Sequence, residues 1–285
     1  DTEYTAQALR NCDLTVQVST KLNRSHLVHG KAALILPCLG RTNIDEQATG
    51  KQFVSVENSM GVVHSSEGVL PPPSDHLLSE PAIVAGVAQA TLGSRSKVDW
   101  AHLISNYDHI RDVIEQVVPG FDDYNRRVRE PGGFYLPNGA RKQEFNTPSG
   151  KAHFTVNELP DSSIPEGQFM MMTIRSHDQY NTTIYGLNDR YRGIYNERRV
   201  VLMNRDDMAE LGLQQEDVVD LIGTHQGQQR TAHRFLVVPY DIPHRCVATY
   251  FPEANVLVPI DSIAKYSKTP ASKRVLIRIE NVTTS

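Results

Sequence analysis

The stretch FMMMTIRSHDQYNT, residues 169–182, starts as an apolar strand and becomes polar at Arg175. The run from Phe169 to Ile174 contains one polar residue, Thr173, which is typical of a strand buried in a sheet. Every residue from Arg175 to Thr182 can donate or accept hydrogen bonds. A core strand that runs directly into such a segment raises the question of what the polar segment binds.

The chain around this stretch is rich in short strands. The β-rich pattern begins at KAHFTV, residues 151–156, and a short helix is predicted over 204–213, with Asn204 as its N-cap and Gly212 at its end. The strands are predicted over 169–174, 198–204, 217–223, 229–239, 246–251 and 274–280. This pattern predicts a closed or nearly closed β-barrel.

The first half of the chain has an α/β pattern. Strands are predicted over 13–20 and 31–38, with a third candidate within 50–66, followed by a proline-rich connector over 68–81. Ser79 and Gly93 delimit a predicted helix, and two further helices within 98–121 are separated near Ser105. Residues 119–150 have the composition of an ordered linker. The predicted domains are therefore an α/β region with its linker (1–150) and a mainly β domain (151–285).

Composition indicates an ordinary globular protein. Of the 285 residues, 39% are hydrophobic and 22% are charged, and the formal net charge is −4, which offers no general attraction to nucleic acid or to an anionic membrane. No apolar run has the length of a transmembrane helix, so we expect no membrane insertion. Any anion-binding site must be local.

The termini and cysteines suggest the context of the chain. The first twenty residues carry neither the basic nor the apolar region of an export signal, and Cys12, Cys38 and Cys246 are scattered, without metal-ligand spacing. We therefore expect a cytoplasmic protein. Because the sequence begins with Asp1 and its opening residues lead into a strand, we also expect a fragment of a longer protein.

Familiar catalytic motifs are missing from the sequence. It contains no GxGxxG, P-loop, GxSxG, HExxH or EF-hand pattern. His177 and Asp178 could form a base and its orienting partner, but neighbouring side chains on a strand point to opposite faces, which argues against this pair. Cys38 is best interpreted as a small core residue.

Four arginines fall within ten residues, in DRYR (189–192) and NERR (196–199). One interpretation is a solvated loop with local ion pairs. The other is a phosphate clamp, because the guanidinium group offers a planar fork of donors to phosphate oxygens. The sequence leaves both interpretations open.

Four motifs in the β-rich half carry a resemblance to a known family. They are TIRSHDQYNT (173–182), MNRDDMAELGLQQEDVVDLIG (203–223), TYFPEANVLVP (249–259) and KTPASKRVLIRIE (268–280). In this order they resemble the C-terminal dinucleotide-binding domain of the molybdopterin-dependent oxidoreductases of the dimethyl sulfoxide reductase superfamily. The resemblance implies a double-psi β-barrel preceded by the tail of an α/β catalytic domain.

The first half resembles the region that precedes this domain in the same superfamily. HGKAALILPC (29–38), VENSMG (56–61) and VDWAHL (98–103) lie where the family has similar segments. The segments 36–70 and 79–93 look most like the formate-dehydrogenase-like, acid-resistance-associated branch. One departure is that no arginine follows Glu57 where the family motif NxEGR has one. The family's molybdenum ligand and its optional iron–sulfur cysteines lie in earlier parts of the chain, so no catalytic residue or metal ligand is assigned here.

The resemblance implies a cofactor and the residues that bind it. The cofactor would be a bis-molybdopterin guanine dinucleotide carrying molybdenum, and Arg175 would neutralise phosphate while Asn255 reads a pterin edge. Lys273 lies near a position where the family often has a polar or basic residue, although an exposed cation is an equal alternative. The predicted binding residues are Thr173, Arg175, Ser176, His177, Gln179, Tyr180, Asn181, Thr182, Asn255 and Lys273.

The implied parent protein is an enzyme that performs two-electron redox chemistry on a small substrate such as formate, with the remainder of its own chain as a partner. The fragment itself would be inactive. The alternative is a non-catalytic binding or adaptor module, because double-psi barrels also serve in that role and a fold does not fix a function.

Overall fold

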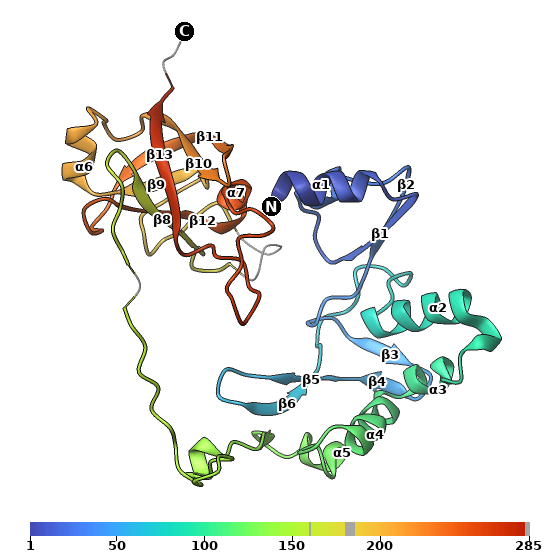
Figure 1. Ribbon diagram of the computed structural model, residues 1–285. Helices are drawn as coiled ribbons and strands as arrows, with labels where there is room; N and C mark the ends of the chain where they lie inside the picture. The colour runs from blue at the N-terminus through green and yellow to red at the C-terminus, as the bar shows by residue number, and fades with distance from the viewer. Residues whose placement is uncertain (160, 180–185, 283–285) are drawn as a thin grey trace. The chain divides into compact units, whose positions relative to one another are not determined.

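The computed structural model describes residues 1–159, 161–179 and 186–282, and six of its strands form a closed β-barrel (Figure 1). The order of the strands around the barrel is β10-β11-β9-β12-β8-β13. Their bounds are β8 (Phe169–Ile174), β9 (Val200–Met203), β10 (Val218–His225), β11 (Gln228–Pro239), β12 (Cys246–Tyr250) and β13 (Val275–Asn281). The predicted barrel and its strand positions are thereby confirmed.

Two strand pairs in the barrel are parallel, and these pairs determine which loops meet. β8 runs parallel to β12, with Ile174 opposite Tyr250, and β9 runs parallel to β11. The remaining neighbours are antiparallel. Because parallel strands end at the same edge of a sheet, the segments that follow β8 and β12 leave the barrel at the same end.

The interior of the barrel explains the apolar strand patterns. On β8, Phe169 and Met171 point into the main core, while Met172 between the inward positions is 40% exposed. β9 is buried on both faces, because Val201 and Met203 join the barrel core and Val200 and Leu202 pack in a second cluster. This two-sided burial accounts for its continuous apolar run.

The chain divides into two compact units. The barrel unit comprises Asp1–Thr15, Lys21–Leu34 and Leu159–Ser285, and the α/β unit comprises Val16–Thr20 and Ile35–Glu158. The chain passes between the units within β1 (Leu14–Ser19) and β2 (Ala32–Pro37). Besides its strands, the barrel unit contains α1 (Thr2–Arg10), η1 (Arg24–Leu27), α6 (Arg205–Glu210), α7 (Phe251–Ala254) and η4 (Asn255–Leu257).

The α/β unit contains the helices predicted from the sequence. α2 begins after its N-cap, Ser79, and ends before Gly93, and α3 and α4 are separated at Asn106. β3 pairs with β4, and β5, β6 and β7 form a second small antiparallel sheet. The elements are β3 (Asp45–Gln47), β4 (Gly50–Gln52), β5 (Val54–Glu57), β6 (Val62–Ser66), α2 (Glu80–Leu92), η2 (Gly93–Arg95), α3 (Trp100–Ser105), α4 (Tyr107–Val117), α5 (Tyr124–Arg127), β7 (Phe134–Tyr135) and η3 (Ala140–Lys142).

Three segments differ from the sequence-based expectations. The opening residues form helix α1 rather than the lead into a strand, with the side chain of Asp1 accepting a hydrogen bond from the backbone of Tyr4. Residues 119–150 contribute to a core, because Tyr124, Val128 and Phe134 are buried together with Val63. Residues 151–156 lie outside any helix or strand and are exposed, since no neighbouring strand pairs with them.

Candidate functional site

The end of the barrel where β8 and β12 terminate brings two predicted binding segments together. Arg175 follows the last residue of β8, and α7 follows the last residue of β12 and continues into η4, which begins at Asn255. Ile174 and Tyr250, the last residues of the two strands, lie opposite each other in the parallel pair. The polar loop and Asn255 therefore lie at the same end of the barrel, although 80 residues of chain separate them.

Arg198 connects these two segments. Its Nε donates to Oε1 of Glu253 in α7 at 3.0 Å, and its NH1 donates to the hydroxyl of Ser176 at 2.9 Å. Its NH2 donates to Oε1 of Gln179 at 3.1 Å, and its guanidinium lies over the Tyr250 ring, 4.5 Å from the centroid. Arg198 is 4% exposed, so this charge is neutralised by Glu253 in the interior rather than by solvent.

A second ion pair, between the buried Asp189 and the partly exposed Arg192, supports the same loop. Asp189 is 1% exposed, and its Oδ2 accepts hydrogen bonds from Arg192 at 2.6 Å and from the Tyr250 hydroxyl at 2.8 Å. Arg192 also donates to the carbonyl of Arg175 at 3.1 Å. Burial by itself raises the pKa of Asp189, but the hydrogen bonds from Arg192 and Tyr250 outweigh it and hold this pKa below its ordinary value. Burial and the bond to Asp189 raise the pKa of Tyr250.

The predicted residues of the polar loop differ in their surroundings. Arg175 is exposed, and its guanidinium makes no hydrogen bond or ion pair with any residue in the described part of the chain. Ser176 is buried, and its backbone nitrogen donates to Oε1 of Gln179 at 3.1 Å. Ser176 and Gln179 thus hold the loop against Arg198, whereas Arg175 offers its donors outward.

His177 and Asp178 lie in a turn beyond the end of β8, and this corrects one inference from the sequence. Nε2 of His177 lies 3.3 Å from Oδ1 of Asp178, because strand alternation no longer applies after Ile174. The same nitrogen lies 2.7 Å from NH2 of Arg190, and the imidazole packs edge-on against Tyr191. The argument that these two side chains cannot approach each other was therefore wrong.

Thr173 and Thr249 place two hydroxyls inside this end of the barrel. They are opposite each other on β8 and β12, both are fully buried, and neither hydroxyl has a hydrogen-bond partner among the described residues. The Nζ of Lys273 donates to the carbonyl oxygen of Thr173. The predicted residue Lys273 is exposed, and its ammonium group binds the end of β8.

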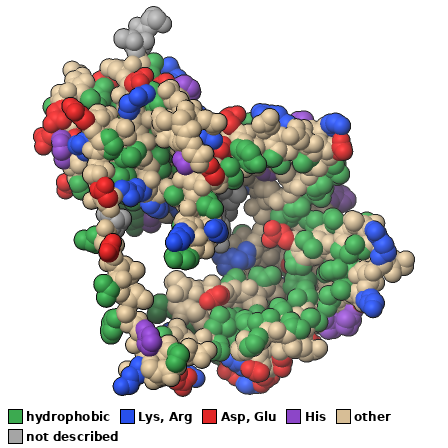
Figure 2. Space-filling model, in the orientation of Figure 1, with side chains coloured by type: hydrophobic (Ala, Val, Ile, Leu, Met, Phe, Trp, Pro, Cys, Tyr) green, Lys and Arg blue, Asp and Glu red, His purple; other side chains and the backbone are tan. Residues whose placement is uncertain are grey.

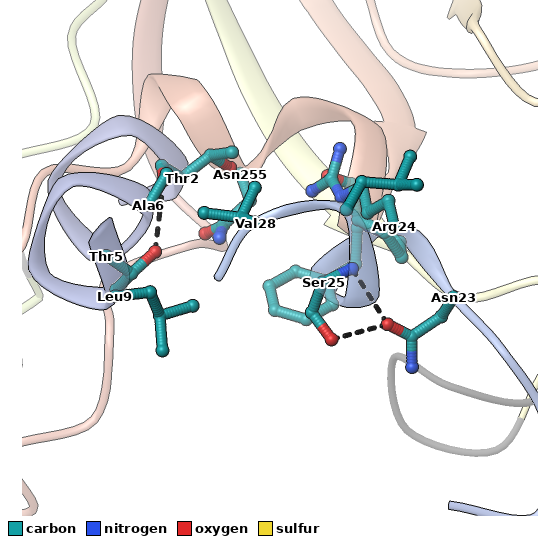
Figure 3. Close-up of a pocket in the computed structure, with 12 residues that line it drawn as sticks. Thr2, Thr5, Ala6, Leu9, Asn23, Arg24, Ser25, Val28 and Asn255 are labelled. Atoms are coloured by element: carbon teal, nitrogen blue, oxygen red, sulfur yellow. Dashed lines mark hydrogen bonds between the residues drawn. The ribbon is translucent and has the colours of Figure 1, made fainter. Parts of the chain in front are cut away.

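Asn255 lines a cavity of about 480 Å³ within the barrel unit (Figure 3). The cavity is bordered by α1, by the segment around η1 and by the start of α7. Arg24 donates to the carbonyl of Pro252 at 2.6 Å at its edge, and Oδ1 of Asn255 lies 3.4 Å from the backbone nitrogen of Asp1. Its size and its mainly apolar wall with a few polar groups are typical of a small-molecule site.

The remaining predicted residues, Tyr180, Asn181 and Thr182, lie outside the described residues. Sequence reasoning did not identify Arg198 and Glu253 as the link between the loop and α7. The cluster of four arginines was the available signal, but neither of its two interpretations included a buried arginine. Arg198 is neither solvated nor directed outward as a clamp, because Glu253, Ser176 and Gln179 occupy its donors.

Comparison with known families agrees with the geometry of this barrel end. Residues 169–276 match the family model described as "Molydopterin dinucleotide binding domain". This stretch of the chain is similar to a molybdopterin dinucleotide-binding domain. The match begins at the first residue of β8 and ends within β13, so this domain is the closed barrel with its loops. The resemblance drawn from the four sequence motifs is confirmed to this extent, and the formate-dehydrogenase-like branch stays a prediction.

Similar proteins extend the likeness to nearly the whole chain. An uncharacterized oxidoreductase of Mycobacterium tuberculosis is 53% identical over 98% of this chain, and protein YdeP of Escherichia coli is 46% identical over the same share. The chain spans 37% of the length of the first relative and 38% of the second.

A solved structure shows a similar fold. Acetylene hydratase from Pelobacter acetylenicus aligns over 87% of this chain and 38% of its own, with a TM-score of 0.51 and 13% sequence identity. This likeness concerns the fold alone. Among the helices that the structure describes, none has both the length and the apolar character needed to span a membrane.

Proposed function

We propose that this chain is the C-terminal part of a molybdopterin-dependent oxidoreductase and that the β8–β12 end of its barrel binds one dinucleotide of a bis-molybdopterin guanine dinucleotide. The observation that carries the proposal is the exposed guanidinium of Arg175, which has no partner among the described residues, beside a loop fixed by Arg198. The two proposed domains remain residues 1–150 and 151–285.

The residues at this barrel end fit a pterin dinucleotide. Such a cofactor presents a polar ring system, a pyrophosphate and a nucleobase, so its site requires many oriented hydrogen bonds rather than one reactive group. Arg175 supplies charged donors that no described residue uses, and the amide of Asn255 supplies both a donor and an acceptor at the edge of a cavity. The buried hydroxyls of Thr173 and Thr249, which have no hydrogen-bond partner among the described residues, add two further polar groups inside the same end.

We assign different roles to the predicted residues. Arg175 and Asn255 would contact the cofactor directly, and so would Tyr180, Asn181 and Thr182, which follow shortly after Arg175 in the sequence. Ser176 and Gln179 would keep the backbone of that loop in place through Arg198. His177 would contribute a ring nitrogen at the loop surface, and Lys273 would hold the end of β8 where Thr173 lies.

When bound, the cofactor would supply molybdenum chemistry in which two electrons are exchanged with a small substrate such as formate. The described residues bind and orient it, and the buried charges around Tyr250 keep their binding surface in one conformation. The molybdenum ligand and any iron–sulfur cluster would be in the remainder of the parent chain. We keep a cytoplasmic location as part of this proposal.

A non-catalytic adaptor barrel is the alternative. Such a module would need no outward-facing arginine supported by a buried network at the end of two parallel strands. The two functions are separated by metal analysis, because an oxidoreductase prepared from cells that make the cofactor would contain molybdenum and release a guanine-containing pterin on denaturation. A protein without either would support the adaptor.

The site is tested by Arg175→Ala and Asn255→Ala in the full-length protein. Each substitution removes hydrogen bonds to a charged or polar cofactor group, which are worth about 1.5–3 kcal/mol each when one partner is charged. We expect cofactor affinity to fall about tenfold or more for Arg175→Ala. Molybdenum per protein, measured by mass spectrometry of the metal, reports the loss.

Arg205→Ala is the matched control, because Arg205 is also an exposed arginine of the barrel unit but lies at the start of α6. We expect Arg205→Ala to contain as much molybdenum per protein as the wild-type protein. If Arg175→Ala and Asn255→Ala also contain the wild-type amount of molybdenum, neither residue belongs to the cofactor site.

A further inference from the structure

Two carboxylates and an imidazole meet at α6. Asp207 and Glu210 lie one helical turn apart on α6, and His244 comes from the segment between β11 and β12. One ligand atom from each residue lies within 4.8 Å of the others. Figure 2 shows acidic side chains gathered over α6 with a histidine beside them. No other such group occurs among the residues that the structure describes.

The buried member of this group has one carboxylate oxygen that accepts no hydrogen bond from the described residues. Asp207 is 1% exposed, and its Oδ2 accepts a hydrogen bond from the backbone nitrogen of Arg245 at 2.8 Å. Its Oδ1 is buried and accepts no well-aligned hydrogen bond from any residue that the structure describes. Nδ1 of His244 nevertheless lies only 2.6 Å from this oxygen. A buried carboxylate oxygen that has no well-aligned hydrogen-bond donor is costly, and a bound cation would compensate it.

A histidine–aspartate pair alone would not require a metal, and the barrel provides a comparison. His233 and Asp220 lie at 2.7 Å, almost the same separation as His244 and Asp207. In that pair the Asp220 side chain is 23% exposed and Oδ1 accepts from the backbone of Arg234. Asp220 thus has donors for both oxygens, and no third ligand lies beside it among the described residues.

We propose that Asp207, Glu210 and His244 bind a divalent first-row transition-metal ion such as Zn²⁺. One imidazole nitrogen and two carboxylate oxygens form a donor set suited to such an ion, and three protein ligands leave room for water. Ligand atoms on a tetrahedral zinc ion lie about 3.3 Å apart, so the exposed side chains of His244 and Glu210 need only small rotations around Asp207. The ion would connect α6 to the segment before β12.

This site does not depend on the proposed molybdopterin function. It lies on α6 and the β11–β12 segment, whereas the cofactor residues follow β8 and β12. Molybdenum content and zinc content are therefore separate readouts of the same samples.

The test uses the full-length protein and the variants Glu210→Gln and His244→Gln. Each protein is equilibrated with Zn²⁺, passed through a desalting column, and measured for zinc and molybdenum by mass spectrometry of the metals. We expect the wild-type protein to retain zinc at this site. Its zinc content per chain should therefore exceed that of either variant by one ion. His233→Gln is the matched control, because it breaks the other histidine–aspartate pair, and it is expected to retain zinc as the wild-type protein does.

Glu210→Gln keeps the test decisive. Glu210 is exposed and has no hydrogen-bond partner within the described ranges, so its substitution leaves the fold unchanged, which circular dichroism verifies. Equal zinc in Glu210→Gln and wild-type protein overturns the proposal, whatever the molybdenum content. Equal zinc loss in His233→Gln also overturns it, because the loss would then not be specific to this group.

Discussion

Asp189 shows how one buried carboxylate can support a binding loop. Its Oδ2 receives hydrogen bonds from Arg192 and from Tyr250, and Arg192 in turn donates to the backbone of Arg175. Burial alone would raise the pKa of Asp189. The hydrogen bonds from these donors have the larger effect, so the pKa lies below its ordinary value. The ionised form is thus preferred in the folded protein, and this preference links proton binding to folding.

Asp189→Asn is predicted to alter stability in a pH-dependent way. Because the folded pKa lies below the unfolded value of about 3.9, the stabilisation by Asp189 is fully present above that pH and is lost as the pH falls through the folded pKa. The difference in the free energy of unfolding between wild type and Asp189→Asn should therefore be large at pH 7 and shrink in acid. Urea unfolding from pH 3 to pH 7 measures it.

The exposed Asp241 serves as the control for this prediction. Asp241→Asn should change stability little at any pH. If the difference in the free energy of unfolding between wild type and Asp189→Asn stays constant across the pH range, the proposed link between the ionisation of Asp189 and folding is contradicted.

At the scale of elements, Arg198 ties the β8 exit loop to α7. It lies just before β9, yet its hydrogen bonds reach Ser176 and Glu253, which lie 22 and 55 residues away in the sequence. Removing a buried charge leaves its partner unpaired, which costs about 3–5 kcal/mol. The side chain of Glu253 is 12% exposed and would be that partner.

Arg198→Met is predicted to destabilise the barrel by about 3–5 kcal/mol and to reduce molybdenum loading, because both segments of the site lose their common support. Arg198→Met combined with Glu253→Gln should recover part of the stability, since it removes the unpaired charge. A double-mutant cycle by thermal unfolding measures this coupling.

The neighbouring Arg199 provides the control for that cycle. Arg199 is exposed and donates to the carbonyl of His233, away from Ser176 and Glu253. Arg199→Met should leave loading unchanged. Similar effects of the two substitutions would exclude a specific role for Arg198.

At the scale of the whole molecule, the barrel core unites strands that are distant in sequence. Met171 is fully buried and packs in a core that also includes Val201, Phe235 and Ile277. The next residue, Met172, is 40% exposed. Two adjacent methionines of identical chemistry thus differ only in their environment.

Met171→Ala is predicted to lower the free energy of unfolding of the barrel by about 2–5 kcal/mol, because it removes buried methylene groups and leaves a cavity. Met172→Ala should cost much less. Trp100 lies in the α/β unit and does not report on the barrel, so hydrogen exchange of peptides from β8 to β13 is the appropriate measurement. Equal loss of protection in both variants would contradict the assignment of faces on β8.

Much of the architecture was predictable from local patterns. The strands of the barrel, the caps of α2 and the break between α3 and α4 follow from apolar periodicity and capping residues, which depend on near neighbours in the sequence. Helix α1 was missed, and residues 151–156 form no strand, because strand pairing depends on a partner that a local pattern does not reveal.

The sequence by itself determined that Phe169–Ile174 is a core strand and that a polar loop begins at Arg175. Only the tertiary structure decided which polar side chains are used internally and which remain available. Arg175 and Arg198 have the same side chain, yet one is exposed without a partner in the described part of the chain and the other is 4% exposed and bound to Glu253. The reason is physical: the parallel pairing of β8 with β12 sets Ser176, Gln179 and Glu253 around Arg198, and no local sequence signal encodes contacts between such distant residues.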